Sequence, residues 1–378
     1  MIYDFIVVGA GMAGTSVAYE LARSGKVCLL ESENRPGLHA TGRSAALFAP
    51  SYGGKEIRAL TRCSRHFFDR PPAGFCEHPL LQERGCLYIA RTDQRPRLGR
   101  MVEEIGASGG SVAIIDVARA RALVPLLRDG YVAEAAFDSD AMDIDVNALQ
   151  HGFLKGARAE GATLMTDSPV KRVKRRNGIW SVELGGGTVE APVLINAAGA
   201  WAQEVAQACG ASPIDLQPLR RTALLVDAPP GVDVRRWPAV IDADEMFYFK
   251  PDAAKLLLSP ADETPDAPGD AQPDDMDVAV GVDRVEAALD LQVRRVGHSW
   301  AGLRTFSSDR LPVLGFDPLV PGFFWSAGQG GYGIQTAPAW ARTAAALARR
   351  ERIPGDLAAE GVTAEDLSPA RFKQVARV

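Results

Sequence analysis

Three glycines near the start of the chain have the spacing of a phosphate-binding turn. Gly9, Gly11 and Gly14 form a Gly-x-Gly-x-x-Gly pattern, and Glu31 follows 17 residues after the third glycine. In such a pattern the first glycine allows a tight turn, the second lets the backbone approach a diphosphate, and the third lets a helix pack closely on a strand. A carboxylate at the position of Glu31 accepts hydrogen bonds from ribose hydroxyls and repels a 2′-phosphate. These residues predict a dinucleotide site.

The residues around the turn supply the elements that this chemistry needs. Residues 3–8 are a β-branched and aromatic run, residues 12–24 have helical spacing, and residues 26–30 form a second apolar run. A strand, turn, helix and strand in this order direct the positive end of the helix dipole at the phosphates. The alternative is a protein that keeps the fold and has lost the nucleotide.

The composition is that of an ordinary globular protein with one elaborate domain or two domains. The chain has 378 residues, is 47% hydrophobic and carries a net charge of -5. This balance argues against nucleic acid as a main partner, because a nucleic-acid-binding domain usually has a basic face. The one basic run, residues 171–176, precedes Asn177-Gly178, a hairpin turn signal, and is expected on a solvated hairpin strand.

The cysteines predict neither a disulfide framework nor a metal site, because they are odd in number and show no Cys-x-x-Cys spacing. They are Cys28, Cys63, Cys76, Cys86 and Cys209. The first strand follows Met1 too closely for a signal peptide, and no run of 18 apolar residues could span a membrane. We therefore expect a cytoplasmic protein.

Three further segments are rich in small residues and could let the backbone approach a flat cofactor. They are residues 40–46, 193–201 and 328–333. The last is expected to open a helix that runs to about Arg350 and directs its N terminus at a polar group. The alternative for the first segment is the start of a helix capped by Thr41. For the second it is a buried core strand without a ligand.

The pattern of the whole chain predicts an α/β protein, α+β overall, with two domains that are both discontinuous in sequence. A Rossmann-type nucleotide-binding domain comprises residues 1–75, 140–215 and 298–378, and a substrate domain built on an antiparallel sheet comprises residues 76–139 and 216–297. Helices are predicted at 56–69, 94–105 and within 143–161. Strands are predicted at 86–90, 111–115, 162–166, 170–175, 180–184, 188–190, 193–197, 222–226, 239–242, 246–250, 255–259 and 291–296, with an exposed loop at 262–277.

These segments, in this order, resemble the flavin-dependent D-amino acid oxidase and dehydrogenase superfamily, which includes the glycine and sarcosine oxidases. Residues 41–46, 71–81, 300–304 and 329–336 are especially similar to the bacterial D-arginine dehydrogenases of that family. The resemblance implies FAD as the cofactor. The glycine motif at 328–333 contains no Cys or His, so covalent attachment of the flavin there is not expected. The cofactor residues that the resemblance implies are Gly9, Gly11, Met12, Ala13, Gly14, Glu31, Ser32, Thr41, Gly42, Arg43, Ser44, Ala45, Ala46, Val170, Ala198, Gly199, Trp201, Gly330, Gly331, Tyr332, Gly333 and Ile334.

The resemblance also implies a clamp for a substrate α-carboxylate, formed by Arg221 and Arg304 as charged partners and by Tyr52 and Tyr248 as hydroxyl donors. The chemistry agrees, because a guanidinium offers a rigid fork that matches a carboxylate. For Arg221 the alternative is a surface ion pair, and for Arg304 it is a bond to a backbone carbonyl.

The implied reaction is the oxidation of an amino acid. The clamp fixes the substrate so that its Cα hydrogen faces flavin N5, a hydride leaves the neutral amine, and the resulting imine hydrolyses to a 2-oxo acid. Positioning carries most of this chemistry, and no strong protein base is required. The electron acceptor stays open. The alternatives are a glycine or sarcosine oxidase-like amine oxidase, a 2-hydroxy acid dehydrogenase on the same scaffold, and a non-catalytic protein.

Two positions depart from the D-arginine dehydrogenases. Leu47 replaces a histidine that contacts the substrate there, and Cys86 replaces the acid that holds the cationic side chain. Burying a guanidinium without a carboxylate is costly, so arginine and lysine are not expected as substrates. The predicted pocket is small and apolar and favours a neutral or hydrophobic D-amino acid, or a cyclic or N-substituted one. Its residues are Leu47, Ala49, Cys86, Ala239, Ile241, Gly331 and Gln335. Cys86 has no basic activator near it in sequence and is expected to be a packed thiol.

Overall fold

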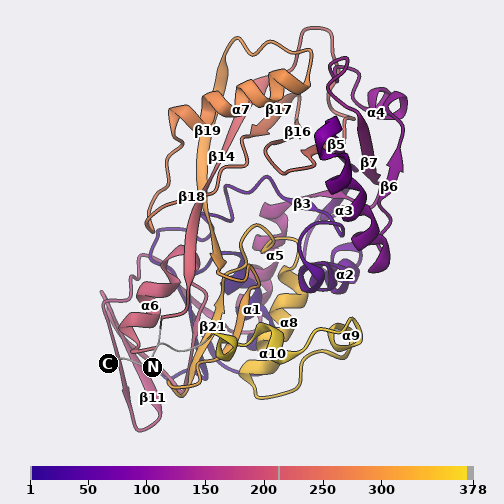
Figure 1. Ribbon diagram of the computed structural model, residues 1–378. Helices are drawn as coiled ribbons and strands as arrows, with labels where there is room; N and C mark the ends of the chain where they lie inside the picture. Colours follow the sequence, from indigo (N-terminus) through magenta and orange to yellow (C-terminus); the bar gives the residue numbers. More distant parts are fainter. Residues whose placement is uncertain (1, 212, 373–378) are drawn as a thin grey trace.

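The glycine turn lies at the centre of a six-stranded sheet in the lower part of the molecule (Figure 1). The structure is a computed structural model that describes residues 2–211 and 213–372, and all elements below belong to these residues. The sheet has the order β20 (Val313–Phe316), β21 (Phe323–Ala327), β13 (Val193–Asn196), β1 (Phe5–Val8), β2 (Val27–Leu30) and β9 (Thr163–Met165). Every neighbouring pair is parallel except β20 with β21. The chain therefore leaves β1 toward β2 on one side and returns to β13 on the other. A doubly wound sheet binds ligands at such a point, outside the carboxyl ends of its strands.

The two faces of β1 are covered by different layers, as the alternation of side chains along a strand requires. Phe5 and Val7 pack in one core with helices α1 (Met12–Ala22), α5 (Val146–Ala159) and α8 (Ala337–Ala348). Ile6 and Val8 pack in a second core beneath an antiparallel three-stranded sheet and helix α6 (Ala202–Ala208). The strands of that small sheet are β10 (Arg172–Arg176), β11 (Ile179–Leu184) and β12 (Gly187–Ala191).

The upper part of the molecule is built on a nine-stranded sheet (Figure 1). Its two longest strands, β14 (Leu216–Asp227) and β19 (Val296–Ser307), pair along their whole length, and helix α7 (Asp275–Ala288) packs on β14 and β17. All pairs are antiparallel except β5 with β15. The other strands are β18 (Thr264–Pro265), β17 (Lys255–Ser259), β16 (Tyr248–Asp252), β15 (Ala239–Asp242), β5 (Cys86–Ala90), β7 (Glu134–Asp138) and β6 (Ala113–Ile115).

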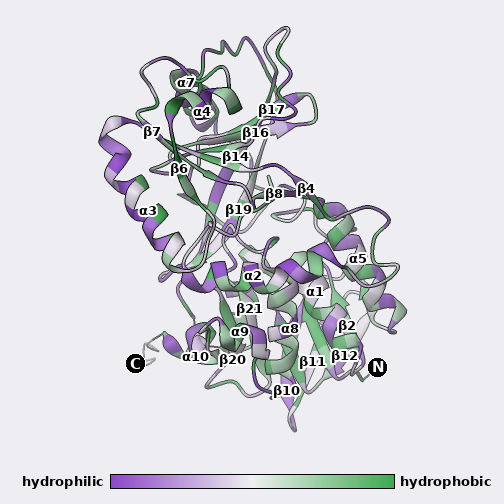
Figure 2. Ribbon diagram, turned by 90° about the vertical axis from the view of Figure 1, so that its right-hand side faces the viewer, coloured by the Kyte–Doolittle hydropathy of each residue, from purple (hydrophilic) through white to green (hydrophobic). Residues whose placement is uncertain are grey.

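The remaining elements connect or flank these two sheets. A short antiparallel sheet consists of β3 (Leu47–Phe48), β8 (Met142–Ile144) and β4 (Leu81–Glu83). The remaining helices are α2 (Lys55–Asp69), α3 (Arg95–Ala107), α4 (Val117–Leu123), α9 (Gly355–Ala359) and α10 (Ala364–Leu367), with 3-10 turns at Thr92–Gln94, Gly199–Trp201 and Pro369–Arg371. In Figure 2 β2 and β21 of the lower part are coloured mainly hydrophobic, whereas α3 at the margin of the upper part carries many hydrophilic residues. No helix of the described residues is long and apolar enough to cross a membrane.

The predicted fold class is confirmed: a Rossmann-type sheet is joined to a second, mainly antiparallel sheet. Strands at 86–90, 239–242 and 255–259 have the predicted bounds, and the basic run forms β10 of a hairpin in which Asn177 and Gly178 both have positive φ. The domain limits stay a prediction. Their boundary at residue 298 falls inside β19.

Three predictions of local structure are wrong. The strand predicted at 291–296 is absent, because β19 begins only at Val296. The loop predicted at 262–277 contains β18 and the first turn of α7, a helix that we did not predict. Its acids are helix-starting residues: Asp274 accepts a hydrogen bond from the Met276 N–H, and carboxylates in a first turn favour the helix dipole. The glycine motif at 328–333 forms turns, and the helix after it begins only at Ala337.

Candidate functional site

At one glycine of the turn the backbone stays open to a ligand. At the other two, neighbouring backbone already occupies the space that a side chain would need. A Cβ on Gly14 would lie 1.8 Å from the Gly9 carbonyl oxygen, and one on Gly9 would lie 2.5 Å from the Ala197 carbonyl oxygen. Gly9 also has φ of +97°, a conformation that favours glycine. A Cβ on Gly11 would meet only the Thr41 hydroxyl, at 3.4 Å. Gly9 and Gly14 are therefore needed for packing, while Gly11 leaves a cradle beside the N terminus of α1.

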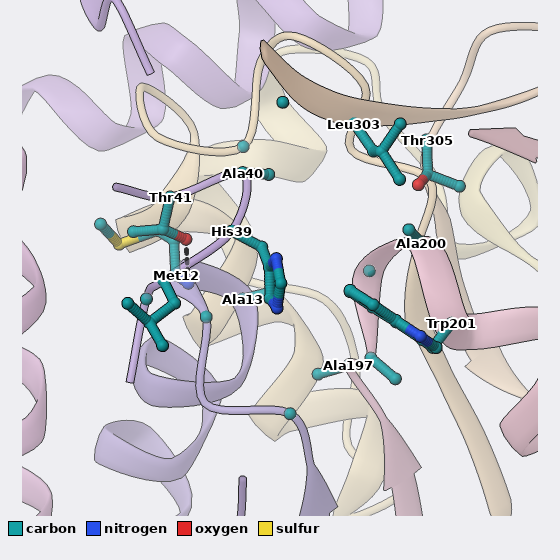
Figure 3. A pocket seen from close by; sticks show the side chains of 18 of the residues that line it. Met12, Ala13, His39, Ala40, Thr41, Ala197, Ala200, Trp201, Leu303 and Thr305 are labelled. Atoms are coloured by element: carbon teal, nitrogen blue, oxygen red, sulfur yellow. Dashed lines mark hydrogen bonds between the residues drawn. The ribbon is translucent and has the colours of Figure 1, made fainter. Parts of the chain in front are cut away.

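Thr41 holds the N terminus of α1 from outside. Its hydroxyl accepts a hydrogen bond from the Met12 N–H at 2.9 Å, which Figure 3 draws as a dashed line. The segment around Thr41 consists of turns, so the alternative of a helix capped by Thr41 is wrong. Thr41 satisfies one of the amides that a helix N terminus leaves unpaired.

Glu31 stands at the end of β2 and is 9% exposed. One carboxylate oxygen accepts the Ala10 N–H at 2.9 Å, and the other accepts the Glu33 N–H at 3.1 Å. A carboxylate has about four acceptor positions, so Glu31 keeps acceptors for the hydroxyls of a ligand while it fixes the turn.

A cavity of about 610 Å³ extends from Glu31 on β2 to Arg304 on β19. It is lined by most of the predicted cofactor residues: Gly9, Gly11, Met12, Ala13, Glu31, Ser32, Thr41, Arg43, Ser44, Ala45, Val170, Ala198, Gly199, Trp201, Gly330, Gly331, Gly333 and Ile334. Gly14, Gly42, Ala46 and Tyr332 are not among its lining residues. Arg43 helps to close the wall, because its guanidinium donates to the carbonyls of Ala271 and Ala301 and binds the Asp270 carboxylate.

His39 lines the same cavity, and the sequence reasoning missed it. Its ring lies 4.7 Å from the ring of Trp201, and Figure 3 shows both side chains in the cavity. The Nε2 atom of His39 is 2.9 Å from a carboxylate oxygen of Glu33, whereas Nδ1 is buried and has no hydrogen-bond partner among the described residues. The sequence signal was a lone histidine between small residues, two positions before Thr41.

At the other end of the cavity lie Arg304 from β19, Tyr248 from β16 and Arg221 from β14. Arg304 is half-buried, and its guanidinium makes no hydrogen bond or ion pair with any residue that the structure describes. Burial alone would raise the pKa of Tyr248, but the positive charges of Arg304 and Arg221 outweigh burial and lower it. This end of the cavity is therefore strongly electropositive.

Arg221 differs from Arg304 because it already has partners. Its Nε donates to the Asp262 carbonyl at 2.8 Å, and its Nη2 donates to a Glu263 carboxylate oxygen at 3.0 Å. Glu263 also binds Arg310. Arg221 thus has an ion pair, but its side chain is 10% exposed and lines the cavity, so this is not the surface pair of the alternative. The guanidinium of Arg304 binds no backbone carbonyl of the described residues.

A second cavity of about 670 Å³ shares Arg221 with the first. Tyr52 and Tyr332 line it, and their ring centroids are 5.0 Å apart. Burial raises the pKa of Tyr52, although the nearby Arg304 opposes this shift. The structure therefore brings Tyr52 close to the electropositive end of the first cavity. The four predicted clamp residues line two adjoining spaces.

The predicted apolar pocket residues lie behind these walls. Ala49, Cys86 and Ala239 are buried in one cluster, and Leu47 and Ile241 pack against it. None of the five lines either cavity. Gln335 is also buried; it accepts the Ala49 N–H and donates to the Thr61 hydroxyl, both at 3.0 Å. Burial raises the pKa of the Cys86 thiol, as expected for a packed cysteine.

A Rossmann-type sheet with a glycine turn, joined to a second sheet that carries a charged cavity, defines a class of nucleotide-dependent oxidoreductases. The comparison with known families is specific: the family described as DAO, FAD dependent oxidoreductase, matches residues 4–347, and the chain belongs to it.

The relatives of the chain match most of its length, but the matched part is a different share of each relative. Mitochondrial dimethylglycine dehydrogenase of Mus musculus is 26% identical over 355 residues, which are 88% of this chain and 40% of that protein. The chain thus spans less than half of that relative. Glycine oxidase of Bacillus licheniformis is 25% identical over 89% of this chain and 90% of its own length. The crystal structure of glycine oxidase from Geobacillus kaustophilus has a TM-score of 0.82 at 22% identity, covers 100% of this chain and 99% of its own, and shares the fold.

FAD is the cofactor of this family, and the residues of the first cavity fit it. Gly11 leaves room for a diphosphate, the N terminus of α1 points there, and Glu31 retains acceptors for ribose hydroxyls. The unpartnered Nδ1 of His39 lies in the same wall.

Proposed function

We propose that the protein uses FAD to oxidise a D-amino acid with a neutral or hydrophobic side chain. The product is the 2-imino acid, which hydrolyses to the 2-oxo acid. The observation that carries this proposal is Arg304, a half-buried guanidinium without a partner among the described residues, at the end of the cofactor cavity. An unpaired guanidinium beside a cavity favours binding of an anion there, and an α-carboxylate matches the geometry of its fork. The larger sheet is proposed to form the substrate domain.

The chain's own residues bind and orient the substrate. Arg304 holds the α-carboxylate, and Tyr248 and Tyr52 donate hydroxyl hydrogen bonds to it. Arg221 stays paired with Glu263 and acts through its charge, because its guanidinium already has two hydrogen bonds. When bound, FAD supplies the acceptor, at N5, for the hydride that leaves the substrate Cα. Holding the carboxylate fixes where Cα lies, and such positioning can account for much of the rate.

The amine must arrive in its neutral form, because the first cavity offers no base near the clamp, and Glu263 of the second cavity is already paired with Arg221 and Arg310. Among the described lining residues of the first cavity, the carboxylates and imidazoles are Glu31, His39 and Glu204. All three come from the nucleotide-binding end: Glu31 directly follows β2, His39 lies in the turns after it, and Glu204 is on α6. Protein groups near Arg304 are therefore arranged to bind an anion and not to remove a proton.

The charges around the clamp support a preference for substrates with a neutral side chain. Cys86 carries no charge, and the neighbouring carboxylate of Asp138 is 1% exposed and already accepts the Ser51 hydroxyl. Among the described residues that line the second cavity, arginines and acidic residues are equal in number. The cavity therefore offers no excess negative charge to a cationic side chain. They are Arg58, Arg97, Arg100, Arg221 and Arg310, with Glu104, Asp242, Asp244, Glu245 and Glu263.

A second candidate function is an amine oxidase of the glycine or sarcosine oxidase type, or a 2-hydroxy acid dehydrogenase on the same scaffold. The carboxylate clamp alone does not distinguish these substrates, because each of them carries a carboxylate. A non-catalytic protein is disfavoured, since it would have no need to keep Arg304 unpaired.

The test is anaerobic bleaching of the flavin absorbance in the purified holoenzyme, with matched D- and L-amino acids that span basic, neutral and hydrophobic side chains. We expect bleaching by neutral D-amino acids and none by D-arginine. Bleaching that is fastest with D-arginine would overturn the side-chain preference. Bleaching by sarcosine or a 2-hydroxy acid alone would favour the second candidate, and a colourless protein that refuses added FAD would overturn both.

A further inference from the structure

A carboxylate without a cation is buried beneath the second cavity. Asp138, at the end of β7, is 1% exposed and forms no ion pair among the described residues. One of its oxygens accepts the Ser51 hydroxyl at 2.5 Å, and the other accepts the Asp140 N–H at 2.9 Å. Burial raises the pKa of Asp138, and the Ser51 hydrogen bond opposes that shift. Burying such a group is costly unless hydrogen bonds compensate, so its presence needs a reason.

The surroundings of Asp138 offer hydrogen-bond donors but, among the described residues, no balancing charge. The cluster around it is made mainly of small apolar residues, including Ala49, Ala136 and Ala239. Its partner across the strands, Cys86, is a buried thiol. Asp138 satisfies the Ser51 hydroxyl and the Asp140 N–H, but no cation among the described residues balances its charge, and departures from local packing rules concentrate at functional sites.

The partner of Asp138 lies next to a predicted clamp residue. Ser51 immediately precedes Tyr52, and its hydroxyl oxygen is also 3.0 Å from the Tyr88 hydroxyl oxygen. Ser51, Tyr52 and Tyr88 all line the second cavity, whereas Asp138 stands behind them. The Ser51 hydroxyl thus connects the cavity wall to the buried carboxylate.

The turn that carries Tyr52 is held at three points. At its start the Ala49 N–H donates to Gln335, in its middle Ser51 donates to Asp138, and near its end Arg58 donates to the Gly53 carbonyl at 2.9 Å. Gly53 has φ of +92°, and a Cβ there would meet Ile57 at 2.7 Å. The bonds at Ser51 and Gly53 flank Tyr52 on its two sides, and of these the bond from Ser51 to Asp138 is the buried one.

We propose that Asp138 and Ser51 are positioning residues that fix the Tyr52 hydroxyl for binding of the substrate carboxylate. This inference rests on the proposed function, because it takes Tyr52 as a donor to that carboxylate. Neither Asp138 nor Ser51 needs to contact the carboxylate. Their hydrogen bond holds the turn in one conformation, so that Tyr52 is ordered before the substrate arrives and binding costs less.

The test is a double-mutant cycle on the holoenzyme, with benzoate as a carboxylate that cannot be oxidised at Cα. Binding is followed by the change in the flavin absorbance. We expect Ser51→Ala to weaken benzoate binding about ten-fold, the scale of one hydrogen bond. In a Tyr52→Phe background the same change should have an effect below about two-fold, because coupled residues are not additive. Ser51→Thr, which keeps the hydroxyl, should restore binding.

Thr363→Ala is the matched control. It removes a hydroxyl that donates to an exposed carboxylate, that of Asp366, at 2.8 Å, and Thr363 lines neither cavity. Benzoate binding should be unchanged in this variant. If Ser51→Ala fails to fold, Asp138→Asn replaces it, since it keeps the shape and removes the charge, and its effect should also vanish in the Tyr52→Phe background.

The outcomes separate this inference from the proposed function. If Tyr52→Phe leaves benzoate binding unchanged, the clamp assignment of Tyr52 fails, and this inference fails with it. If Tyr52→Phe weakens binding but the effects of Ser51→Ala and Tyr52→Phe are additive, the clamp stands and the positioning role is overturned. An unchanged affinity in Ser51→Ala also overturns it.

Discussion

The guanidinium of Arg304 lies directly against Gly331, where an added Cβ would come within 2.8 Å of Nη1. The two residues come from β19 and from the turns before α8, so two distant segments of the chain shape the same end of the cofactor cavity. The absence of a side chain at Gly331 lets the guanidinium occupy its place. This contact makes the orientation of Arg304 testable without removing its charge.

Gly331→Ala should weaken carboxylate binding although Arg304 is retained. The Cβ displaces the guanidinium, and a bidentate contact tolerates little misplacement, so we expect a loss of at least about ten-fold, or about 1.4 kcal/mol. Arg304→Lys keeps the charge but loses the fork and should cost about 1.5–3 kcal/mol. The measurement is benzoate titration of the holoenzyme. Gly355→Ala, where an added Cβ meets nothing within 4 Å, is the control. Unchanged affinity in both test variants would exclude Arg304 from the clamp.

The glycines of the first turn should respond differently to alanine. Gly14→Ala forces a Cβ to within 1.8 Å of the Gly9 carbonyl oxygen, so the strand and helix must move apart, and the FAD-free protein should lose about 1–3 kcal/mol of stability. Gly11→Ala places its Cβ 3.4 Å from Thr41, in ordinary contact. It should leave the thermal midpoint of the FAD-free protein near wild type but weaken FAD binding about ten-fold, or about 1.4 kcal/mol. Equal destabilisation of the FAD-free protein by both variants would contradict this division of roles.

Local patterns explain why much of the nucleotide-binding fold could be predicted. The glycine spacing and the apolar runs beside it fixed β1, α1 and β2, because each of these elements is specified by neighbouring residues. Helix α7 was missed for the same local reason: acids that start a helix have the composition of an exposed loop. The pairing of β14 with β19, two strands of 12 residues each, joins segments that are far apart in sequence, so no local window reveals its length.

The candidate site was predictable only in part. Composition around Thr41 and Gly331 indicated where backbone approaches the cofactor, and the family resemblance supplied Arg304 and Tyr248. The pairing of Arg221 with Glu263 and the bond from Ser51 to Asp138 link residues that are 42 and 87 positions apart. Such contacts depend on the tertiary fold, which brings distant segments together, and leave no spacing pattern in the sequence.

His39→Ala should weaken FAD binding and leave the fold intact. His39 lines the cofactor cavity beside Trp201, and its Nδ1 lacks a partner among the described residues, so a bound ligand can satisfy it. Loss of one hydrogen bond predicts a dissociation constant about five- to ten-fold higher. The measurement is flavin fluorescence during titration of the FAD-free protein. His66→Ala, on α2 and outside both cavities, should bind FAD as the wild type does. Equal affinity in the two variants would show that His39 does not contact FAD.

The alkaline limit of activity should belong to Tyr248. Arg304 and Arg221 lower its pKa below the ordinary value for tyrosine, about 10, despite the opposing effect of burial, whereas burial raises the pKa of Tyr52. As the pH rises through the lowered pKa, Tyr248 loses the proton that it donates to the substrate carboxylate and gains a negative charge beside it. Substrate binding should therefore weaken as the pH rises on the alkaline side. On the acidic side, activity should increase with pH, because the substrate amine loses its proton. The product of the two effects is a bell-shaped profile of kcat/KM.

Tyr248→Phe separates the alkaline fall of the pH profile (the alkaline limb) from its rise on the acidic side (the rising limb). The variant should bind benzoate more weakly at neutral pH, because one donor is lost, but its affinity should no longer fall until a higher pH, at which Tyr52 ionises. The rising limb of kcat/KM should stay where it is, since it reports the substrate amine. Benzoate has no amine, so its binding isolates the alkaline limb in the wild type and in the variant. An alkaline fall that keeps its position in Tyr248→Phe would assign it to another group and remove Tyr248 from the clamp.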